Sequence, residues 1–403
     1  MQPIRAEHRP LLHIAGGQPM LEQTLAWAAI NSGTGNLPGL ANVAGLLADA
    51  FSALPGEVRL LDADDVEQVS ADGTVSISAR GRNLHLAVRP QAPVQVLLTG
   101  HMDTVFPVDH AFQTHRTLAD GRINGPGVAD MKSGLAVMLA ALKAVEASPE
   151  AARIGYEVIV NSDEETGSHG SSALIMRAAR GKAAALTYEP AATPQGMLAG
   201  ARPGSGNFSI VVTGRSAHAG RNPQDGRNAI LAAADLALRL AEAKGPGLSV
   251  NPARIDGGGP NNVVPDHAVL RVNMRPRTPD DEARARRHLD EAIAAVSARH
   301  DVNIHLHGGF SRPPKPVDPA AERLFELVKA CGAALGQPIG WAPSGGVCDG
   351  NNIAACGVPV VDTMGARGGA IHSSDEFLIP ESLAERAQLS ALVLLSLAEK
   401  GRP

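Results

Sequence analysis

Short apolar runs alternate with segments of helical periodicity along the first 200 residues. The run VQVLLTG at 94–100 is continuous and follows Pro93, which predicts a buried strand. Apolar residues recur every three or four positions at 19–31, 39–54 and 131–147, which predicts three helices. Further strand-like runs are EVRLL, TVSIS, NLHLAV, GYEVIVN and AAALT. Strands that alternate with helices indicate an α/β domain with a largely parallel sheet.

A different element order begins near residue 200 and lasts about a hundred residues. The pattern predicts strand, helix, strand, strand, helix and strand, with the helices at 226–244 and 279–298. This is the β-α-β-β-α-β order of the split βαβ, or ferredoxin-like, sandwich. After the proline-rich stretch 312–319 the α/β pattern resumes, with helices predicted at 319–336 and 381–399 and a strand in VPVVDTM. We therefore predict a discontinuous domain of residues 1–202 and 314–403, with residues 203–313 as an inserted domain.

Side chains that bind metal ions follow the predicted strands. In an open α/β sheet, ligands gather beyond the carboxyl ends of the strands, so these side chains are expected to meet at one edge. They are His101, the pair Glu164 and Glu165, Glu189 and, after a glycine-rich loop, His372. Asp130 precedes the helix at 131–147 and is a further candidate.

Two imidazoles and three carboxylates suit a pair of divalent ions, and zinc is the usual choice for mixed nitrogen and oxygen ligands. Asp103 stands two residues after His101 and can accept a hydrogen bond from the far nitrogen of that ring. Glu164 and Glu165 point apart if both are extended, so one binds metal and the other stays free. A free carboxylate at such a site is a candidate general base.

The amino-acid composition argues against a nucleic acid or a membrane as a binding partner. The 403 residues include 36 basic and 41 acidic side chains, a net charge of −5, so no nucleic acid partner is expected. No apolar run approaches the roughly 18 residues that a membrane span needs, and the N-terminus lacks a secretory apolar region. Cys331, Cys348 and Cys356 are an odd set without metal-ligand spacing, which favours a reducing compartment. These features predict a cytoplasmic protein with no membrane partner.

Seven segments, in this order, resemble the M20 metallopeptidases, particularly the glutamate carboxypeptidase branch. They are HMDTV, GPGVADMKSG, NSDEETGS, YEP, GRSAHAG, NNVVPD and AIHSSDEF. The resemblance covers nearly the whole chain. It implies a discontinuous zinc-exopeptidase-like catalytic domain with a mixed, largely parallel sheet, and an inserted α+β (ferredoxin-like) domain that mediates dimerisation.

The resemblance also assigns the metal ligands. Asp130 would bridge two Zn²⁺ ions, with Co²⁺ or Mn²⁺ as possible replacements. The remaining ligands would be His101 and Glu189 at one ion, and Glu165 and His372 at the other. Glu164 would be the general base and Asp103 the partner of His101. A cis peptide bond between Asp130 and Met131 is implied as well.

Substrate contacts are implied for four residues. His218, in the AHAG motif, would reach the active site of the partner subunit in a homodimer and polarise the scissile carbonyl. Asn262, Arg275 and Arg312 would contact substrate, and Arg312 would pair with a substrate carboxylate through its bidentate geometry. One departure is the pair Val347 and Cys348, where relatives more often carry a hydroxyl residue, and this changes the polarity expected on that side of the pocket.

These assignments predict a zinc-dependent hydrolase that cleaves an amide next to a free carboxylate, such as a small peptide with a C-terminal glutamate or an N-acyl amino acid. One alternative is a deacylase of small N-acyl metabolites that uses the same site. Another is a metal-binding protein of the same fold that has lost turnover. The last alternative predicts that the free base has been replaced, whereas Glu164 is present.

Overall fold

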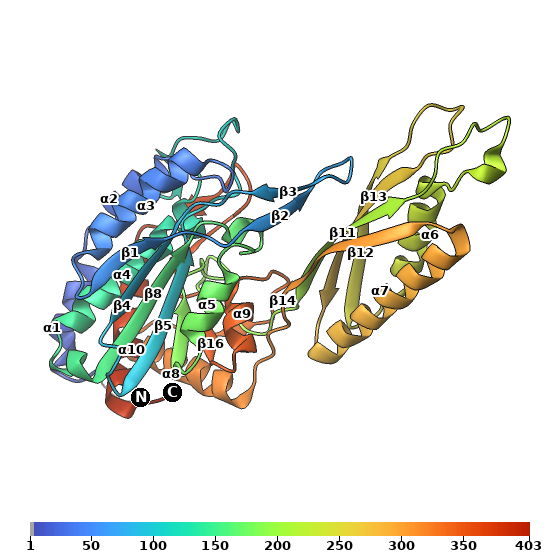
Figure 1. Ribbon diagram of the computed structural model, residues 1–403. Coiled ribbons are helices and arrows are strands. Elements are labelled where there is room, and N and C mark those ends of the chain that lie inside the picture. Colours follow the sequence, from blue (N-terminus) through green and yellow to red (C-terminus); the bar gives the residue numbers. More distant parts are fainter. Residues whose placement is uncertain (1–3) are drawn as a thin grey trace.

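The computed structural model describes residues 4–403, so the first three residues of the predicted segment 1–202 lie outside it. Two bodies lie side by side and are joined by two crossing segments (Figure 1). The larger body contains a six-stranded sheet in the order β1-β4-β8-β5-β9-β16. Strands β8, β5, β9 and β16 run parallel, whereas β1 and β4 pair antiparallel at one side. The mixed, largely parallel sheet predicted from the sequence is confirmed.

Helices cover both faces of this sheet. The strands are β1 (Glu57–Leu61), β4 (Asn83–Val88), β5 (Val94–His101), β8 (Ile154–Asn161), β9 (Ala184–Thr187) and β16 (Val360–Val361). The helices are α1 (His8–Gly16), α2 (Met20–Ala28), α3 (Leu37–Phe51), α4 (Ser133–Glu146), α5 (Ser172–Ala179), α8 (Pro319–Ala334), α9 (Asp349–Ala355) and α10 (Ser382–Lys400). Helices α1 and α9 were not predicted, and a helix as short as α9 has too few turns to show a periodicity.

Alternate side chains of the central strands enter two different cores. Val96 and Leu98 of β5 pack with α1 to α4, α8 and α10, while Leu97 between them packs with α5 and α9. This division explains why β5 is apolar at every position, because both of its faces are buried. Helix α4 is buried around most of its circumference for the same reason, since it lies between the sheet and α10 (Figure 1).

Several short strands extend the larger body beyond its six-stranded sheet. β6 (Arg116–Thr117), β7 (Ile123–Asn124), β17 (Gly368–Gly369) and β18 (Phe377–Leu378) form a small sheet. β10 (Leu198–Ala199) pairs with β15 (Trp341–Ala342). β2 (Val66–Val69) and β3 (Val75–Ser78) form a hairpin that projects toward the second body (Figure 1). β2 was not predicted, because its VEQV has only two apolar positions.

The second body is a four-stranded antiparallel sheet with two helices packed on it. Its elements are β11 (Ser205–Thr213), α6 (Ala229–Glu242), β12 (Leu248–Gly257), β13 (His267–Pro276), α7 (Pro279–His300) and β14 (Asn303–Arg312), with the strands in the order β12-β13-β11-β14. It has an apolar core of its own. This element order matches the predicted ferredoxin-like pattern. The exact domain limits, residues 203 and 313, stay a prediction.

The two segments that cross between the bodies are fastened to each other. The backbone N–H of Arg202 donates to the carbonyl of Lys315 over 2.9 Å, and the N–H of Lys315 donates back over 3.0 Å. Both side chains also pair with Asp362, whose carboxylate is fully buried, at 2.8 and 3.0 Å. At a second place, the Arg271 guanidinium donates to the carbonyl of Val69 in the β2–β3 hairpin. The second body is thus held against the first at two separate points.

The helices and the cysteines of the described residues bear on the predicted location and redox state. Over residues 4–403, every helix is too short or too polar to cross a lipid bilayer. Among these residues, Cys331, Cys348 and Cys356 are free thiols, and the reducing compartment stays a prediction. The cytoplasmic location stays a prediction.

Candidate active site

The carboxyl end of β5 presents the first predicted ligand. His101 is the last residue of this strand and is buried. The preceding Gly100 leaves room here for Leu135 and Met131, because a Cβ at that position would lie 2.6 Å from the ends of both side chains, which would have to shift. Glycine therefore lets the start of α4 approach the end of β5. This close approach brings the residues before α4 next to His101.

Asp130 lies between the two predicted histidine ligands. Its Oδ1 is 3.1 Å from Nε2 of His101, and its Oδ2 is 3.3 Å from Nε2 of His372. Asp130 and Met131 have non-helical backbone angles and are joined by a cis peptide bond, so the regular helix begins only at Ser133. The helix predicted over 131–147 therefore starts two residues late.

Glu165 and Glu189 complete the group on opposite sides of Asp130. Glu165 Oε2 is 3.2 Å from Nε2 of His372, and Glu189 Oε2 is 3.7 Å from Nε2 of His101. His372 has φ of 63°, a conformation that non-glycine residues adopt rarely and often at functional sites. The five predicted metal ligands therefore come together, as the sequence predicted for one edge of the sheet.

The electrostatics of this group are unfavourable in the absence of a cation. Asp130, Glu164, Glu165 and Glu189 all line one cavity of about 510 Å³. Burial raises the pKa of Glu165 to about 7, and the Asp130 carboxylate adds to this shift. Burial also raises the pKa of Glu164 and of Glu189. Buried carboxylates that face one another in this way are stabilised by positive charge placed between them.

The donor set fits divalent metal ions. Ligand atoms of His101, Asp130 and Glu165 lie within 4.8 Å of one another, as do those of His101, Glu164 and Glu189. Glu189 Oε1 is buried and has no hydrogen-bond partner among the described residues, so one lone pair in the site is left without a partner. Nitrogen and oxygen donors in this mixture suit zinc and similar first-row ions.

Asp103 organises the two neighbouring glutamates as well as the histidine. The backbone carbonyl of Asp103 is 3.0 Å from Nδ1 of His101, and Oδ1 of Asp103, the partner expected from the sequence, is 3.3 Å from the same nitrogen. Its two carboxylate oxygens also accept the backbone N–H groups of Glu164 and Glu165, each over 3.1 Å. Thr34 donates a further hydrogen bond to Oδ2 over 2.7 Å. Asp103 thus orients both the imidazole and the turn that carries the glutamates.

Glu376 supports Asp130 and was not assigned from the sequence. Its carboxylate accepts the backbone N–H groups of Gly127, Ala129 and Asp130 at 2.9 to 3.2 Å. Burial raises the pKa of Glu376 to about 7. The available signal was its place in the AIHSSDEF segment, four residues after His372. That segment alone does not reveal that the side chain turns back toward a loop 250 residues earlier in the chain.

Replacing Glu376 with alanine is expected to destabilise the protein by at least about 3 kcal/mol. Three buried N–H groups would lose their acceptor, and each unsatisfied group costs about 1–3 kcal/mol. The free energy of unfolding in urea measures this loss. The neighbouring variant Asp375→Ala is the control, because Asp375 is exposed. Equal stabilities of the two variants would contradict the supporting role of Glu376.

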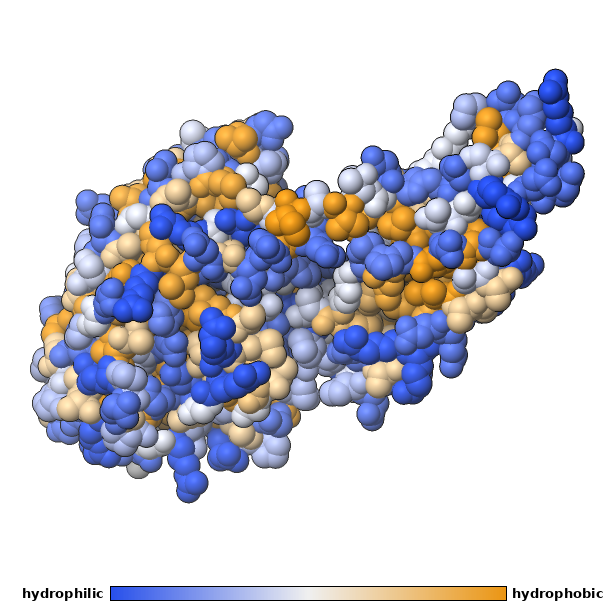
Figure 2. Space-filling view, viewed as in Figure 1, coloured by the Kyte–Doolittle hydropathy of each residue, from blue (hydrophilic) through white to orange (hydrophobic). Residues whose placement is uncertain are grey.

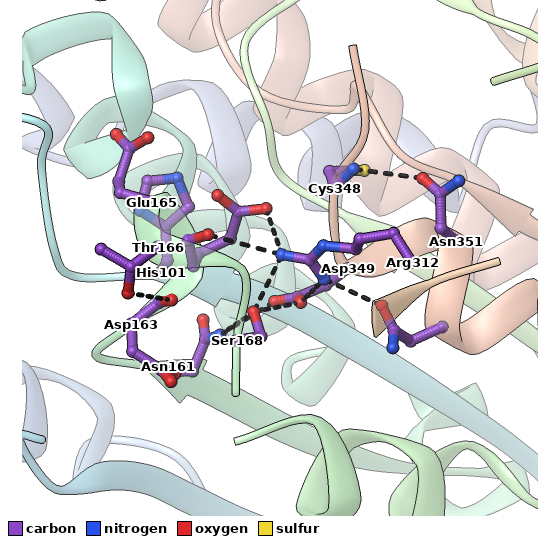
Figure 3. A network of polar contacts seen from close by, with 12 residues as sticks. His101, Asn161, Asp163, Glu165, Thr166, Ser168, Arg312, Cys348, Asp349 and Asn351 are labelled. Atoms are coloured by element: carbon purple, nitrogen blue, oxygen red, sulfur yellow. Dashed lines mark hydrogen bonds and ion pairs between the residues drawn. The ribbon is translucent and has the colours of Figure 1, made fainter. Parts of the chain in front are cut away.

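Arg312 ends β14 of the inserted body, and its side chain reaches into the catalytic body and contacts the predicted general base. Its Nη2 donates to Oε1 of Glu164 over 2.7 Å, and the guanidinium also pairs with Asp349. Figure 3 shows Arg312 at the centre of this network, with Ser168 and Asp349 beside it. The side chain is buried, being only 2% exposed. The sequence predicted a contact with substrate for Arg312, whereas its nearest charged partners here are carboxylates of its own chain.

The other predicted substrate residues lie on the inserted body. His218 and Asn262 are close to each other, because the N–H of Ala219 donates to the carbonyl of Asn262. Both belong to the loops at the end of this body that points away from the catalytic body (Figure 1), and both are exposed. Arg275, on β13, instead faces the catalytic body and donates to the carbonyl of Gly345 over 3.2 Å.

Val347 and Cys348 form part of the cavity wall, as the sequence comparison with hydroxyl-bearing relatives suggested. Cys348 is buried at the start of α9, and its N–H donates to the side chain of Asn351 over 3.1 Å (Figure 3). Burial raises the pKa of the Cys348 thiol well above its usual range. The wall beside Glu189 is therefore less polar than a serine or threonine would make it.

Comparison with known proteins gives consistent matches along the chain. Residues 97–396 match the model of peptidase family M20/M25/M40. Carboxypeptidase G2 of Pseudomonas sp. (strain RS-16) is 28% identical over 386 residues, which cover 94% of this chain and 90% of that protein. A succinyl-diaminopimelate desuccinylase of Psychrobacter arcticus is 28% identical over 328 residues, which cover 75% and 78%.

A solved structure agrees with the fold. The YXEP protein of Bacillus subtilis, a dinuclear metal binding peptidase from M20 family, superposes with a TM-score of 0.65 at 15% identity. The superposition covers 94% of this chain and 98% of that protein. The α/β body and the second body are thus matched together.

Proposed function

Because the chain belongs to peptidase family M20/M25/M40 and is a metallohydrolase of that family, we propose that it hydrolyses an amide bond next to a free carboxylate. The observation that carries this proposal is the position of Asp130, with one oxygen toward His101 and the other toward His372. A carboxylate placed in this way suits two cations that share it. Carboxypeptidase G2 is a relative whose name indicates such a reaction.

The metal site is proposed to hold two divalent ions, with zinc as the first choice. His101 and Glu189 would bind one ion, Glu165 and His372 the other, and Asp130 both. Bound ions would polarise the scissile carbonyl and make water a stronger nucleophile at neutral pH. The name of the YXEP protein supports the number of ions, because that protein of the same fold is dinuclear.

Glu164 is proposed as the general base. Its carboxylate lines the cavity beside the ligands, so it can take a proton from the attacking water and pass it to the leaving amine. Arg312 holds Oε1 of Glu164, which leaves Oε2 free for the proton. The buried guanidinium also offsets part of the negative charge around this base.

His218 is proposed to complete the site of a partner subunit. It lies on the distal loops of the inserted body, so a second copy of the chain provides the route to a catalytic pocket. Apolar surface on this body supports a homodimer, because Leu231 and Leu238 on α6 are 59% and 69% exposed and stand two helical turns apart. Figure 2 shows this body with apolar groups on its surface. An uncharged imidazole N–H would stabilise the developing oxyanion.

Mixing two inactive variants is expected to restore activity if His218 acts across the dimer. His218→Ala and Glu164→Gln chains would form hybrids in which one of the two sites has both residues. With equal mixing and free exchange, about a quarter of all sites would be intact. Hydrolysis after exchange measures this, with each variant alone as control. No recovery, despite hybrids seen by native mass spectrometry, would mean that each site is complete within one chain.

A deacylase of small N-acyl metabolites is the second candidate function. It is favoured by the match to a desuccinylase, and it uses the same metal ligands and the same base. A panel of N-acyl-glutamates, N-acyl-lysines and dipeptides, tested on protein loaded with Zn²⁺, Co²⁺ or Mn²⁺, separates the two. Hydrolysis confined to N-acyl-lysines would favour the deacylase. No release from any member by metal-loaded protein would overturn both and favour a binding protein that has lost turnover.

A further inference from the structure

A second group of side chains that can bind metal lies outside the catalytic cavity, where the first helix meets the last. Ligand atoms of Glu7, His8 and Glu399 all lie within 4.8 Å of one another. His8 begins α1, Glu7 precedes it, and Glu399 stands in the last turn of α10. These two helices pack against each other in the larger body (Figure 1). The group therefore joins side chains from opposite ends of the described chain.

The imidazole of His8 is buried and one of its nitrogens lacks a hydrogen bond. The side chain is only 4% exposed. Its Nε2 lies 3.1 Å from Oε1 of Glu399, yet it has no hydrogen-bond partner within residues 4–403. A buried polar atom without a partner costs free energy, and a ligand at Nε2 would recover that cost.

The separations in this group fit the ligands of one divalent ion. Nitrogen and oxygen ligands lie about 2.0–2.2 Å from a tetrahedral zinc ion, so two of them are about 3.3–3.6 Å apart. The 3.1 Å between His8 and Glu399 is close to this value and equals the distance between His101 and Asp130 in the catalytic group. The Glu7 side chain makes no capping hydrogen bond to α1, so its carboxylate is available as a third ligand.

A cavity of about 330 Å³ opens beside the group. His8 and Glu399 line it together with apolar side chains of α8 and α10, such as Leu327 and Leu392. Glu7 stands on the exposed side of the group. An ion held by the three side chains would thus lie between solvent and an apolar interior, and it can reach this position from solvent.

Arg5 is the cation that faces the two carboxylates. Its Nη1 lies 2.8 Å from Oε1 of Glu399 and 3.5 Å from Oε1 of Glu7. The Arg5 side chain is 58% exposed, so it can give up these contacts to solvent at little cost. A divalent ion would balance both carboxylates in its place. It would also use the lone pair on Nε2 of His8, which Arg5 leaves without a partner.

We propose that Glu7, His8 and Glu399 form a binding site for a divalent ion of the zinc type, which fastens α1 to α10. An imidazole nitrogen combined with carboxylates favours Zn²⁺ over Ca²⁺, which prefers oxygen ligands alone. Because the three ligands meet only in the folded chain, the ion stabilises that chain by mass action. The site is independent of the proposed hydrolase function, since none of its three residues lines the catalytic cavity.

The number of Zn²⁺ ions bound by the full-length protein tests this site. The native protein is compared with Glu399→Gln, and Asp130→Asn with Asp130→Asn/Glu399→Gln, after equilibrium dialysis against Zn²⁺ and metal analysis. We expect the Glu399→Gln change to remove one Zn²⁺ per chain in both comparisons. The difference within each pair counts this ion alone, whatever the catalytic cavity binds. Hydrolysis by the Glu399→Gln chain is expected to equal that of the native chain.

Variants of the other residues assign the ion to this group. His8→Asn is expected to lose the same single Zn²⁺, with His13→Asn as the matched control, because His13 is exposed on the same helix. Glu7→Gln should weaken binding by about tenfold or more. Arg5→Gln should instead tighten it severalfold, because the competing guanidinium is removed. The glutamine variants change partly exposed side chains, so they test the site even if His8→Asn folds poorly.

Three results would overturn the site. They are equal zinc contents with and without Glu399→Gln, an equal loss of zinc in His8→Asn and His13→Asn, and binding of Ca²⁺ as tight as that of Zn²⁺. None of them bears on the proposed hydrolase function, which the substrate panel tests separately. Conversely, absence of hydrolysis for every substrate would leave this zinc count unaffected.

Discussion

Glutamine at position 164 is expected to lower kcat by about 10²–10⁴-fold, the usual contribution of a general base, while the metal content stays at its native level. Glu164 lines the catalytic cavity, and its Oε1 is held by Arg312, so the side chain is fixed in place for proton transfer. Glutamine has the same shape and keeps the contact with Arg312, but it cannot accept the proton. Steady-state kinetics and metal analysis of the same preparation measure both quantities.

Two further variants separate the loss of a general base at position 164 from the loss of a metal ligand and from a general effect of a glutamate-to-glutamine change. Glu165→Gln should reduce metal content together with activity, because Glu165 faces His372 and Asp130 as a proposed ligand. Glu22→Gln makes the same chemical change at an exposed position and should alter neither quantity. If Glu164→Gln also lost metal, the roles of the two neighbouring glutamates as base and ligand would have to be exchanged.

Asparagine at position 130 is expected to reduce the affinity for metal by more than about 100-fold, with loss of hydrolysis. Changes to groups that only support metal ligands already cost about 10–100-fold, and Asp130 is the one proposed to touch both ions. The substitution removes the charge that faces His101 and His372 and leaves an amide in its place. Competition with a chelator, followed by metal analysis, measures the change.

Asp49→Asn is the matched control for this variant, because Asp49 is exposed on α3. The number of metal ions bound per chain shows whether Asp130 is a ligand of both ions or of only one. Loss of both ions agrees with a shared ligand, whereas loss of one ion with full retention of the other would restrict Asp130 to a single site. Retention of both ions would remove Asp130 from the ligand set and with it the observation that carries the proposed function.

Local sequence patterns were sufficient to predict most of the helices and strands and the candidate metal ligands at their ends. The strand that ends at His101 is continuous and apolar because both faces of β5 are buried, and this leaves a clear trace in the sequence. The ferredoxin-like order of the inserted body follows in the same way from alternating strand and helix periods. The convergence of His101, Glu165 and Glu189 follows from the rule that parallel strands end at one edge.

Contacts between residues that lie far apart in the sequence could not be predicted, because they leave no recognisable pattern in it. The sequence did not reveal that the Arg312 guanidinium pairs with Glu164 and Asp349, and the contact of Arg312 with substrate stays a prediction. Glu376 stands in the AIHSSDEF segment, but this position does not reveal that it accepts three N–H groups of the loop before Asp130. Such pairings depend on which polar groups the folded structure brings within hydrogen-bonding distance of a buried charged side chain.

The sequence by itself determined the fold class, the family resemblance and the five candidate metal ligands, whose roles stay a prediction, since all of these depend on short-range periodicity and on motifs at the ends of strands. Only the tertiary structure decided that Asp130 stands between two histidines and that Glu376 accepts the backbone N–H groups of the loop before Asp130. The physical reason is that metal geometry and charge clustering are properties of distances in space. Those distances are set by the packing of helices and sheets that lie far apart along the chain.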